Sequence, residues 1–249
     1  MSTKFSAVIF TCLILVTGLP GNQVMAGDNP AEARAAQTAR VAMLLFDEEE
    51  PGTGVYPVRY LISDAYLRID DGHDASDYIL LDRSSSVIYS ISHEYGNILV
   101  IHRQPPGSLP EDLKLAHEPV PDTEAPSIAG KQPRQFRYLA NGELCYEAVL
   151  VPGLMTAAVK GLAEYEQLLG RQQATKLEST PAQLRTPCFL SRYIHAPGRH
   201  LEQGLPIQVW DDSGYRQALV NFSDRTDVST HLFEVPSEYQ EVTIGIAAD

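Results

Sequence analysis

The sequence is poor in cysteine, tryptophan and basic residues. It has three cysteines, one tryptophan and 19 Lys plus Arg against 32 Asp plus Glu among 249 residues, so the formal net charge is −13 at pH 7. No basic run is interleaved with aromatic residues, which excludes the usual electrostatic basis for binding nucleic acid. The G-x-S-x-G, H-E-x-x-H, P-loop and G-x-G-x-x-G motifs are all missing. We therefore expect no catalytic residue, no cofactor and no nucleic-acid partner.

The amino terminus does contain an apolar run, and it has the pattern of a secretory signal peptide. A lysine precedes the run from Phe5 to Leu19, and Val24-Met25-Ala26 provides a cleavage site. The run is shorter than the roughly 20 apolar residues of a membrane-spanning helix, and no later run is long enough. We expect cleavage near Ala26 to remove the signal peptide 1–26. The mature chain should then be a periplasmic protein with a flexible segment at 27–38 and no stable membrane anchor.

Two cysteines remain after this cleavage, Cys145 and Cys188. An even number in an oxidising compartment favours one disulfide, which would stabilise the fold by about 4 kcal/mol in the chain-entropy model. No C-x-x-C pair points to redox chemistry or zinc. Among seven scattered histidines only His195 and His200 are close, and the Pro197-Gly198 pair between them prevents their presentation on adjacent helical turns. We therefore predict no metal site.

From Arg40 onward, short runs of Val, Ile, Leu and Tyr alternate with turn residues about every ten residues, a pattern typical of antiparallel β structure. It predicts a single β-rich domain over 39–249 with roughly eight to eleven strands. A Pro-rich connection at 104–133 interrupts the strands and holds at most one short strand near Leu113 to His117. The other predicted strands cover Val41–Phe46, Val58–Ser63, Tyr66–Asp70, Asp77–Asp82, Ser86–Ser92, Asn97–Arg103, 206–211, 215–223 and His231–Pro236.

Local turn and capping signals complete the prediction. Asn141-Gly142 divides the run Arg134 to Val151 into a hairpin with a type I′ turn. Apolar residues at helical spacing predict a helix from Met155 to Leu169, ended by Gly170. Thr186-Pro187 predicts the start of a second, shorter helix that stops before Pro197. Cys188 would lie in its first turn, so the disulfide would tie this helix to the strand that carries Cys145.

The stretch YLRIDDGHDASDYILLD, from Tyr66 to Asp82, contains five aspartates and a histidine. The spacing does not match a calcium loop, so we predict a turn between two strands. Arg68 shares a strand face with Tyr66, and two interpretations stay open. It could form a cross-strand ion pair with Asp77 or Asp82, or it could hold a polar group of a ligand at the mouth of a concave sheet.

The stripe Met155, Leu162 and Leu169 on the longer predicted helix also has two interpretations. Such a stripe is the usual contribution of a helix to a hydrophobic core. In an open, curved sheet, a helix that lies in the concavity would use the same stripe to line an apolar cavity.

The segments YLRID, DYILLDRSSSVIYSIS and NILVI, together with the late LFEVPSEY, resemble exported bacterial proteins with the LolA/LolB-like fold. That fold is an unclosed antiparallel β barrel partly covered by helices. The resemblance covers Val58 to Ile101 and Phe233 to Tyr239, and it matches Arg68 to an arginine on a strand of the family. It implies a periplasmic protein that binds an acyl chain or another apolar ligand.

These observations predict a mainly β protein with two helices, built as a single curved antiparallel sheet or unclosed barrel with helices in or over its concave face. The leading hypothesis is a non-enzymatic periplasmic binding or carrier protein for an apolar ligand or lipoprotein. A cell-envelope interaction module without a cavity and a hydrolase with a dispersed site are the alternatives, and the oligomeric state stays open. The candidate ligand contacts are Tyr66, Arg68, Met155, Leu162 and Leu169.

Overall fold

A computed structural model describes residues 37–121 and 125–244, so the predicted signal peptide lies outside the described residues. The described residues form one sheet of 12 strands in the order β12-β6-β5-β4-β3-β2-β1-β11-β10-β9-β8-β7. Neighbours are antiparallel except β12 and β6, which are parallel. The strands are β1 (Thr38–Glu49), β2 (Tyr56–Ile62), β3 (Tyr66–Asp70), β4 (Tyr78–Asp82), β5 (Val87–Ser92), β6 (Asn97–Ile101), β7 (Leu115–Pro119), β8 (Arg134–Ala140), β9 (Glu143–Val151), β10 (Leu205–Trp210), β11 (Arg216–Ser229) and β12 (Gln240–Ile244).

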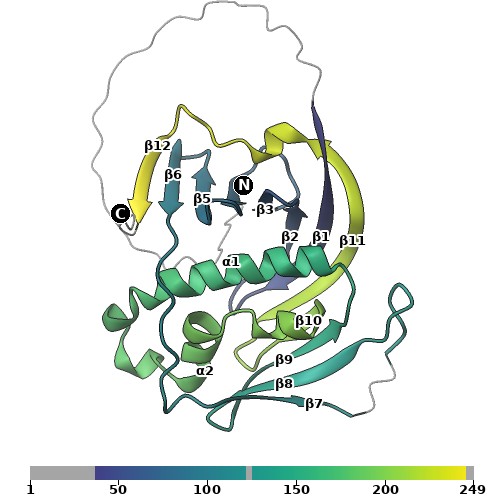
Figure 1. The fold of residues 1–249 in the computed structure, drawn as a ribbon, viewed down its shortest axis with the longest axis vertical. Helices are drawn as coiled ribbons and strands as arrows, with labels where there is room; N and C mark the ends of the chain where they lie inside the picture. The colour runs from purple at the N-terminus through teal and green to yellow at the C-terminus, as the bar shows by residue number, and fades with distance from the viewer. Residues whose placement is uncertain (1–36, 122–124, 245–249) are drawn as a thin grey trace, which may run out of the picture.

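The sheet curves around one long helix, α1 (Thr156–Ala174). Figure 1 shows α1 lying between the strands from β12 to β11 and the strands from β10 to β7. The end strands β12 and β7 do not pair with each other, so the barrel is unclosed. The predicted mainly β class, with a curved unclosed sheet and two helices, is thus confirmed. Among the described residues no helix has both the length and the hydropathy that a bilayer span requires.

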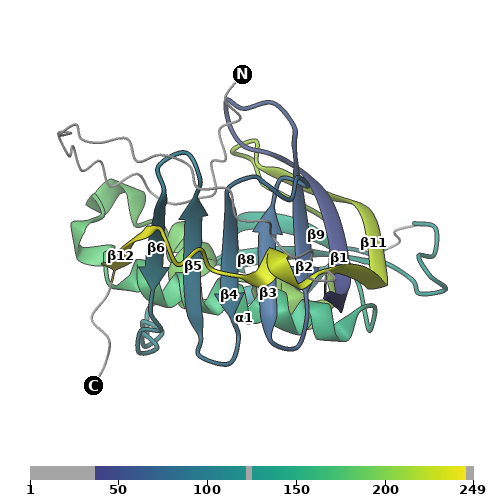
Figure 2. The same cartoon turned by 90° about the horizontal axis from the view of Figure 1, so that it is seen from above.

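The face of the sheet opposite α1 is also covered by a chain segment. Figure 2 shows the segment between β11 and β12 running across β3, β4 and β5 on the side opposite α1. Successive side chains of a strand point to opposite faces, so each face has its own core. On β3, Leu67 and Ile69 belong to the core around α1, whereas the outer core contains Leu80 of β4 together with Leu232 and Phe233 of the covering segment.

Most of the predicted elements are present, with boundaries shifted by a few residues. The strand Tyr66–Asp70 is found as predicted, and Asn141 and Gly142 have φ values of 52° and 83°, as a type I′ turn requires. The Pro-rich connection contains one named strand in its described part, β7.

The predicted strand His231–Pro236 is wrong. Thr230–Phe233 is a short 3₁₀ helix, η5, in which the Ser229 side chain accepts a hydrogen bond from the backbone N–H of His231. The turn places Leu232 and Phe233 against the outer face of the sheet, where both are buried. The last strand instead begins at Gln240 and pairs with β6, a non-local pairing that local sequence pattern does not indicate.

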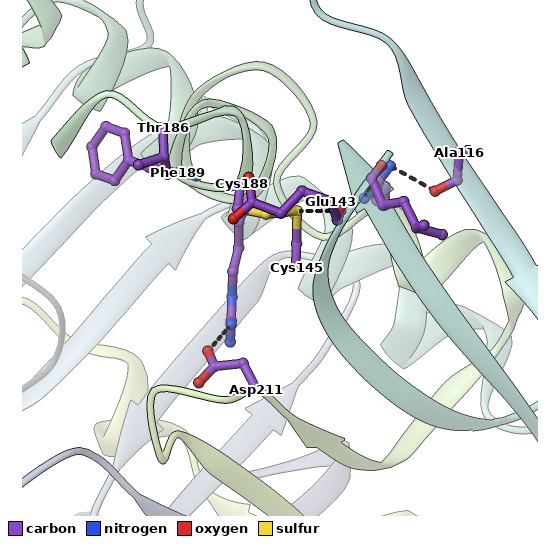
Figure 3. The surroundings of a disulfide bond; sticks show 10 residues. Ala116, Glu143, Cys145, Thr186, Cys188, Phe189 and Asp211 are labelled. Carbon is purple, nitrogen blue, oxygen red and sulfur yellow. Dashed lines mark hydrogen bonds and ion pairs between the residues drawn. A yellow bond between two sulfur atoms is a disulfide. The ribbon is translucent and has the colours of Figure 1, made fainter. Parts of the chain in front are cut away.

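The second helix and the disulfide are confirmed. Helix α2 (Pro187–Phe189) has Thr186 as its N-cap, whose hydroxyl accepts a hydrogen bond from the Phe189 N–H at 3.2 Å. It continues as a π-helical turn, η3 (Leu190–His195), and a 3₁₀ turn, η4 (Arg199–Gln203). We call residues 187–203 the cap segment. The Cys145–Cys188 disulfide ties its beginning to β9, as Figure 3 shows.

Gly170 does not end helix α1, which continues to Ala174. A Cβ at this position would lie 2.6 Å from Cγ of Pro197 and 3.2 Å from the carbonyl oxygen of Ile194. The glycine is therefore required by the close approach of the cap segment to the helix. Gly161, two turns earlier, faces the sheet in the same way, because its Cβ would lie 2.9 Å from Cγ2 of Ile62.

We predict that Gly170→Ala destabilises the protein by about 1–3 kcal/mol, because the added methyl overpacks a rigid proline ring. In an ordinary helix interior, replacing glycine with alanine would instead stabilise the protein by about 1 kcal/mol. A loss of stability would therefore indicate the close contact with Pro197. The measurement is urea unfolding followed by circular dichroism. Gly107→Ala is the control, because its Cβ would meet nothing closer than Cβ of Ala174 at 4.0 Å. A stabilised Gly170→Ala variant would contradict the packing described here.

Candidate functional site

A cavity of about 440 Å³ lies between the concave face of the sheet, helix α1 and the cap segment. Its apolar floor is built by one side chain from each of six consecutive strands, because alternation directs every second residue to this face. These six are Phe46, Val58, Ile69, Ile79, Ile88 and Ile101. Leu162 and Leu169 of α1 line the cavity from the helix side. Both layers thus contribute apolar groups to the cavity.

The lining also includes polar and aromatic side chains. Glu48 near the end of β1 faces Tyr56 on β2 and Gln217 on β11 across the strand pairs. The Gln217 side-chain amide donates a hydrogen bond to the Glu48 carboxylate at 2.7 Å. Helix α1 contributes Tyr165 and Glu166, one helical turn from Leu162 and so on the same face of the helix. Further polar and aromatic residues of the lining are Glu50, Tyr60, Tyr146, Arg192, Tyr193, His200 and Tyr215.

Two of the carboxyl groups at this polar end, those of Glu48 and Glu166, have raised pKa values. Burial raises the pKa of Glu48 from 4.5 to about 7, the hydrogen bond from Gln217 opposes this, and the nearby charges of Glu166 and Glu50 raise it further. Burial also raises the pKa of Glu166, and the charge of Arg192 only partly offsets it. Among the described residues, the Glu166 side chain makes no hydrogen bond or ion pair. The polar end therefore holds acidic groups that the protein itself does not neutralise.

Arg192 is the cation that the cap segment places at this end, and its charge is already paired. Its guanidinium forms an ion pair with Asp211 and lies 4.6 Å from the ring centroid of Tyr215 and 5.1 Å from that of Tyr146. Burial alone would lower the pKa of Arg192, but Tyr193, Tyr215 and Asp211 raise it overall. The arginine thus completes a wall of the cavity.

His200 is neutral at physiological pH. Burial lowers its pKa to about 3, and the positive charges of Arg192 and Arg199 lower it in addition. Burial raises the pKa of Tyr146 to about 12, so this phenol also stays protonated. Among the described residues, no group of three or more His, Cys, Asp or Glu side chains could hold a metal ion.

The candidate ligand contacts fall into three groups. Leu162 and Leu169 line the cavity. Met155, at the start of α1, is buried in the same core but does not line the cavity. Tyr66 and Arg68 project from β3 to the opposite face of the sheet, because they alternate with Leu67 and Ile69. The structure therefore places them away from this cavity.

Arg68 does not form the cross-strand ion pair with Asp77 or Asp82 that was one of its two interpretations, because it pairs with Asp70 on its own strand. Its Nε lies 2.6 Å from Asp70, and its other nitrogens donate hydrogen bonds to the carbonyl oxygens of Leu232 and Asp74. Arg59 on the neighbouring strand pairs with the same aspartate at 2.8 Å. The side chain of Asp70 also accepts a hydrogen bond from the Gly72 N–H, within the turn that the sequence predicts. Asp70 thus organises the turn. Its partner Arg68 attaches the segment between β11 and β12 to the sheet through the Leu232 carbonyl oxygen.

The carboxyl groups at the polar end were missed by the sequence analysis. Glu166 interrupts the apolar stripe of α1 between Leu162 and Leu169, and a charge within such a stripe is a signal that could have identified it. Glu48 stands in the acidic run Asp47 to Glu50, where nothing distinguishes it from a solvated residue. Arg192 and Tyr215 reach the cavity only through tertiary packing.

Comparisons with known proteins do not identify a family. No family model matches the sequence, and no curated protein matches it. Among solved structures, PNGF-II in the C2 and in the P21 space group is similar, with a TM-score of 0.39 and 8% sequence identity in each case. The match covers 83% of this chain and 31% or 32% of PNGF-II, so this chain spans about a third of that protein. At this level the similarity does not define the fold or the function.

We predict that Asp70→Asn destabilises the protein by about 3–5 kcal/mol, because it leaves two guanidinium groups facing one buried neutral side chain. The free energy of unfolding in urea measures this effect. Asp227→Asn is the matched control. It breaks an ion pair with Arg40 at 3.1 Å whose side chains are 62% and 64% exposed, so the expected change is below about 1 kcal/mol. Equal effects of the two variants would contradict a structural role for Asp70.

A second prediction concerns the pH dependence of stability. The folded protein holds the Glu48 proton up to a pKa of about 7, whereas the unfolded chain releases it near 4.5. This contribution to stability is fully present below pH 4.5 and is lost as the pH rises through 7. Relative to the wild type, ligand-free Glu48→Gln should therefore gain stability between about pH 5 and pH 8.

Urea unfolding at a series of pH values measures this difference. Glu143→Gln, which removes an exposed carboxyl group on β9, is the control for the loss of one negative charge. A constant difference between Glu48→Gln and the wild type across this range would contradict the raised pKa.

Proposed function

We propose that this protein is a non-enzymatic binding or carrier protein for an apolar ligand, with the ligand's hydrocarbon part held in the cavity between the sheet and α1. The observation that carries the proposal is the apolar floor, in which six consecutive strands each direct one large side chain toward unfilled space. The volume of about 440 Å³ lies within the range of known small-molecule sites. Burial of a hydrocarbon chain there would contribute about 0.8 kcal/mol per methylene group.

The LolA/LolB-like resemblance supports the same proposal. It implies an unclosed barrel with helices on its concave face, and the protein has an unclosed sheet around α1. We extend the resemblance to an acyl chain or a lipoprotein as the ligand and to the periplasm as its place of action. The disulfide is compatible with that compartment, which is oxidising.

The direct test is native mass spectrometry of the protein purified from the periplasm without detergent. We expect a bound mass that organic solvent extracts and that re-binds to the stripped protein. The stripped protein should also bind the apolar fluorophore N-phenyl-1-naphthylamine with a saturable rise in emission. If the protein shows no bound mass and no saturable fluorophore binding, the proposal is wrong.

We predict that Leu169→Trp weakens fluorophore binding at least tenfold, because the larger side chain fills the apolar part of the cavity and removes contact area. Leu169 is only partly buried and faces the cavity, so the change should be tolerated by the fold. Val220→Trp is the control, because Val220 is 57% exposed on β11. Equal fluorophore affinity in the two variants would place the ligand elsewhere.

One observation favours hydrolysis as a second candidate function. Glu48 and Glu166 both face the cavity with raised pKa values, and paired carboxyl groups of this kind act as general acid and base in many hydrolases. A screen of the purified protein against generic ester, phosphate and glycoside substrates tests it. Turnover that Glu166→Gln abolishes would support hydrolysis over a carrier function.

A further inference from the structure

We propose that the polar end of the cavity binds an organic ammonium group, so that the preferred ligand is a cationic amphiphile with its hydrocarbon chain on the apolar floor. This inference rests on the proposed binding function and adds the chemical class of the ligand's head group. It follows from the charges, the aromatic rings and the apolar floor that meet in this one cavity.

The charge balance at the polar end favours a cation. Glu48, Glu50 and Glu166 all line the cavity, and the only guanidinium in the described lining, that of Arg192, is paired with Asp211. His200 is neutral, so it adds no positive charge. Burial is the main cause that raises the pKa of Glu48, and the charges of Glu166 and Glu50 raise it further. A cation beside these carboxyl groups would oppose both effects, because an opposite charge favours the ionised form. A carboxylate or phosphate head group would instead be repelled.

The aromatic rings at this end support the same chemistry. Tyr146, Tyr193 and Tyr215 already surround the Arg192 guanidinium, at 5.1, 5.6 and 4.6 Å from their ring centroids. Tyr60 and Tyr165 also line the cavity, and in the described part of the chain neither ring has a cation over its face. Rings beside carboxylates are the usual surroundings of an alkylammonium group in proteins, because the ring face and the carboxylate both attract it.

Packing fixes the position of Glu166 relative to the cap segment. A Cβ at Gly198 would lie 2.9 Å from Cβ of Glu166, so the glycine allows the cap segment to pass directly over this side chain. Glu166 nevertheless keeps part of its surface free and lines the cavity. The carboxylate is thus held between the cap segment and the floor, with a ligand as its available partner.

The test compares three amphiphiles with linear tails of nearly equal length and different head groups: dodecyltrimethylammonium, dodecan-1-ol and dodecanoate. The two ionic compounds are used below their micelle concentrations and the alcohol below its solubility limit, each to displace N-phenyl-1-naphthylamine from the stripped protein at pH 8. We expect the ammonium compound to bind at least roughly tenfold more tightly than the alcohol, and the alcohol more tightly than the carboxylate.

The double variant Glu48→Gln/Glu166→Gln should lose this preference, with dodecan-1-ol affinity changed less than about twofold, because the alcohol does not use the charges. Glu118→Gln/Glu143→Gln is the matched control. It removes the same charge from two exposed positions and should keep the wild-type order of affinities. Circular dichroism and a thermal melt establish that each variant is folded.

The pH dependence gives a second readout, because the charge of dodecyltrimethylammonium does not change with pH. Its affinity should rise roughly tenfold from pH 5.5 to pH 8 as Glu48 loses its proton, and Glu48→Gln should largely remove this rise. The charged, titratable and hydrogen-bonding groups that face Glu48 are Glu50 on its own chain segment, Tyr56 and Tyr60 from β2, Tyr165 and Glu166 from α1, and Tyr215 and Gln217 from the β10–β11 hairpin.

The outcomes separate this inference from the proposed function. If dodecan-1-ol or dodecanoate binds as tightly as the ammonium compound, or if the double variant keeps the preference, the cation site is wrong while the apolar cavity stands. If none of the three displaces the fluorophore and the fluorophore itself does not bind, the proposed binding function fails, and the cation site fails with it.

Discussion

The close packing of α1 between the curved sheet and the cap segment is the constraint on which the rest of the structure depends. Two contacts set it, and neither leaves room for a side chain: Gly161 meets Ile62 of β2, and Gly170 meets Pro197 of the cap segment. A helix can pack closely at such points and stay further from its neighbours elsewhere. Residues of both layers line the cavity, including Gly170 and Pro197 of the second contact.

The disulfide extends this constraint to the polar end. Cys145 immediately precedes Tyr146, and Cys188 begins the helical turns that carry Arg192 and Tyr193. Linking these two segments holds the guanidinium among the rings and beside Asp211, so the positive charge of the cap segment is satisfied internally. The carboxyl group of Glu48 has only the hydrogen bond from Gln217, and that of Glu166 has no ion pair among the described residues. This charge imbalance arises only in the folded protein, because Glu48, Glu166 and Arg192 come from different elements.

On the outer face of the same sheet, charged groups pair with one another and stabilise the fold. Asp70 pairs with Arg59 and Arg68, and Arg68 reaches the carbonyl oxygen of Leu232 in the covering segment. All three charged groups have partners within the protein, which is the condition under which buried ion pairs are tolerated. Arg68 was a candidate ligand contact by sequence, and the alternation along β3 assigns it to this network.

Local signals in the sequence were enough to predict four features: the strand Tyr66–Asp70, the hairpin turn at Asn141-Gly142, the N-cap at Thr186 and the disulfide. These depend on backbone preferences and nearby partners, which a short window of residues contains. Three other features depend on long-range packing: helix α1 continues through Gly170, His231–Pro236 is not a strand, and β12 pairs with β6. The tertiary structure also decided that Glu48 and Glu166 share one cavity, because long-range packing sets which face a residue occupies and which charges it meets.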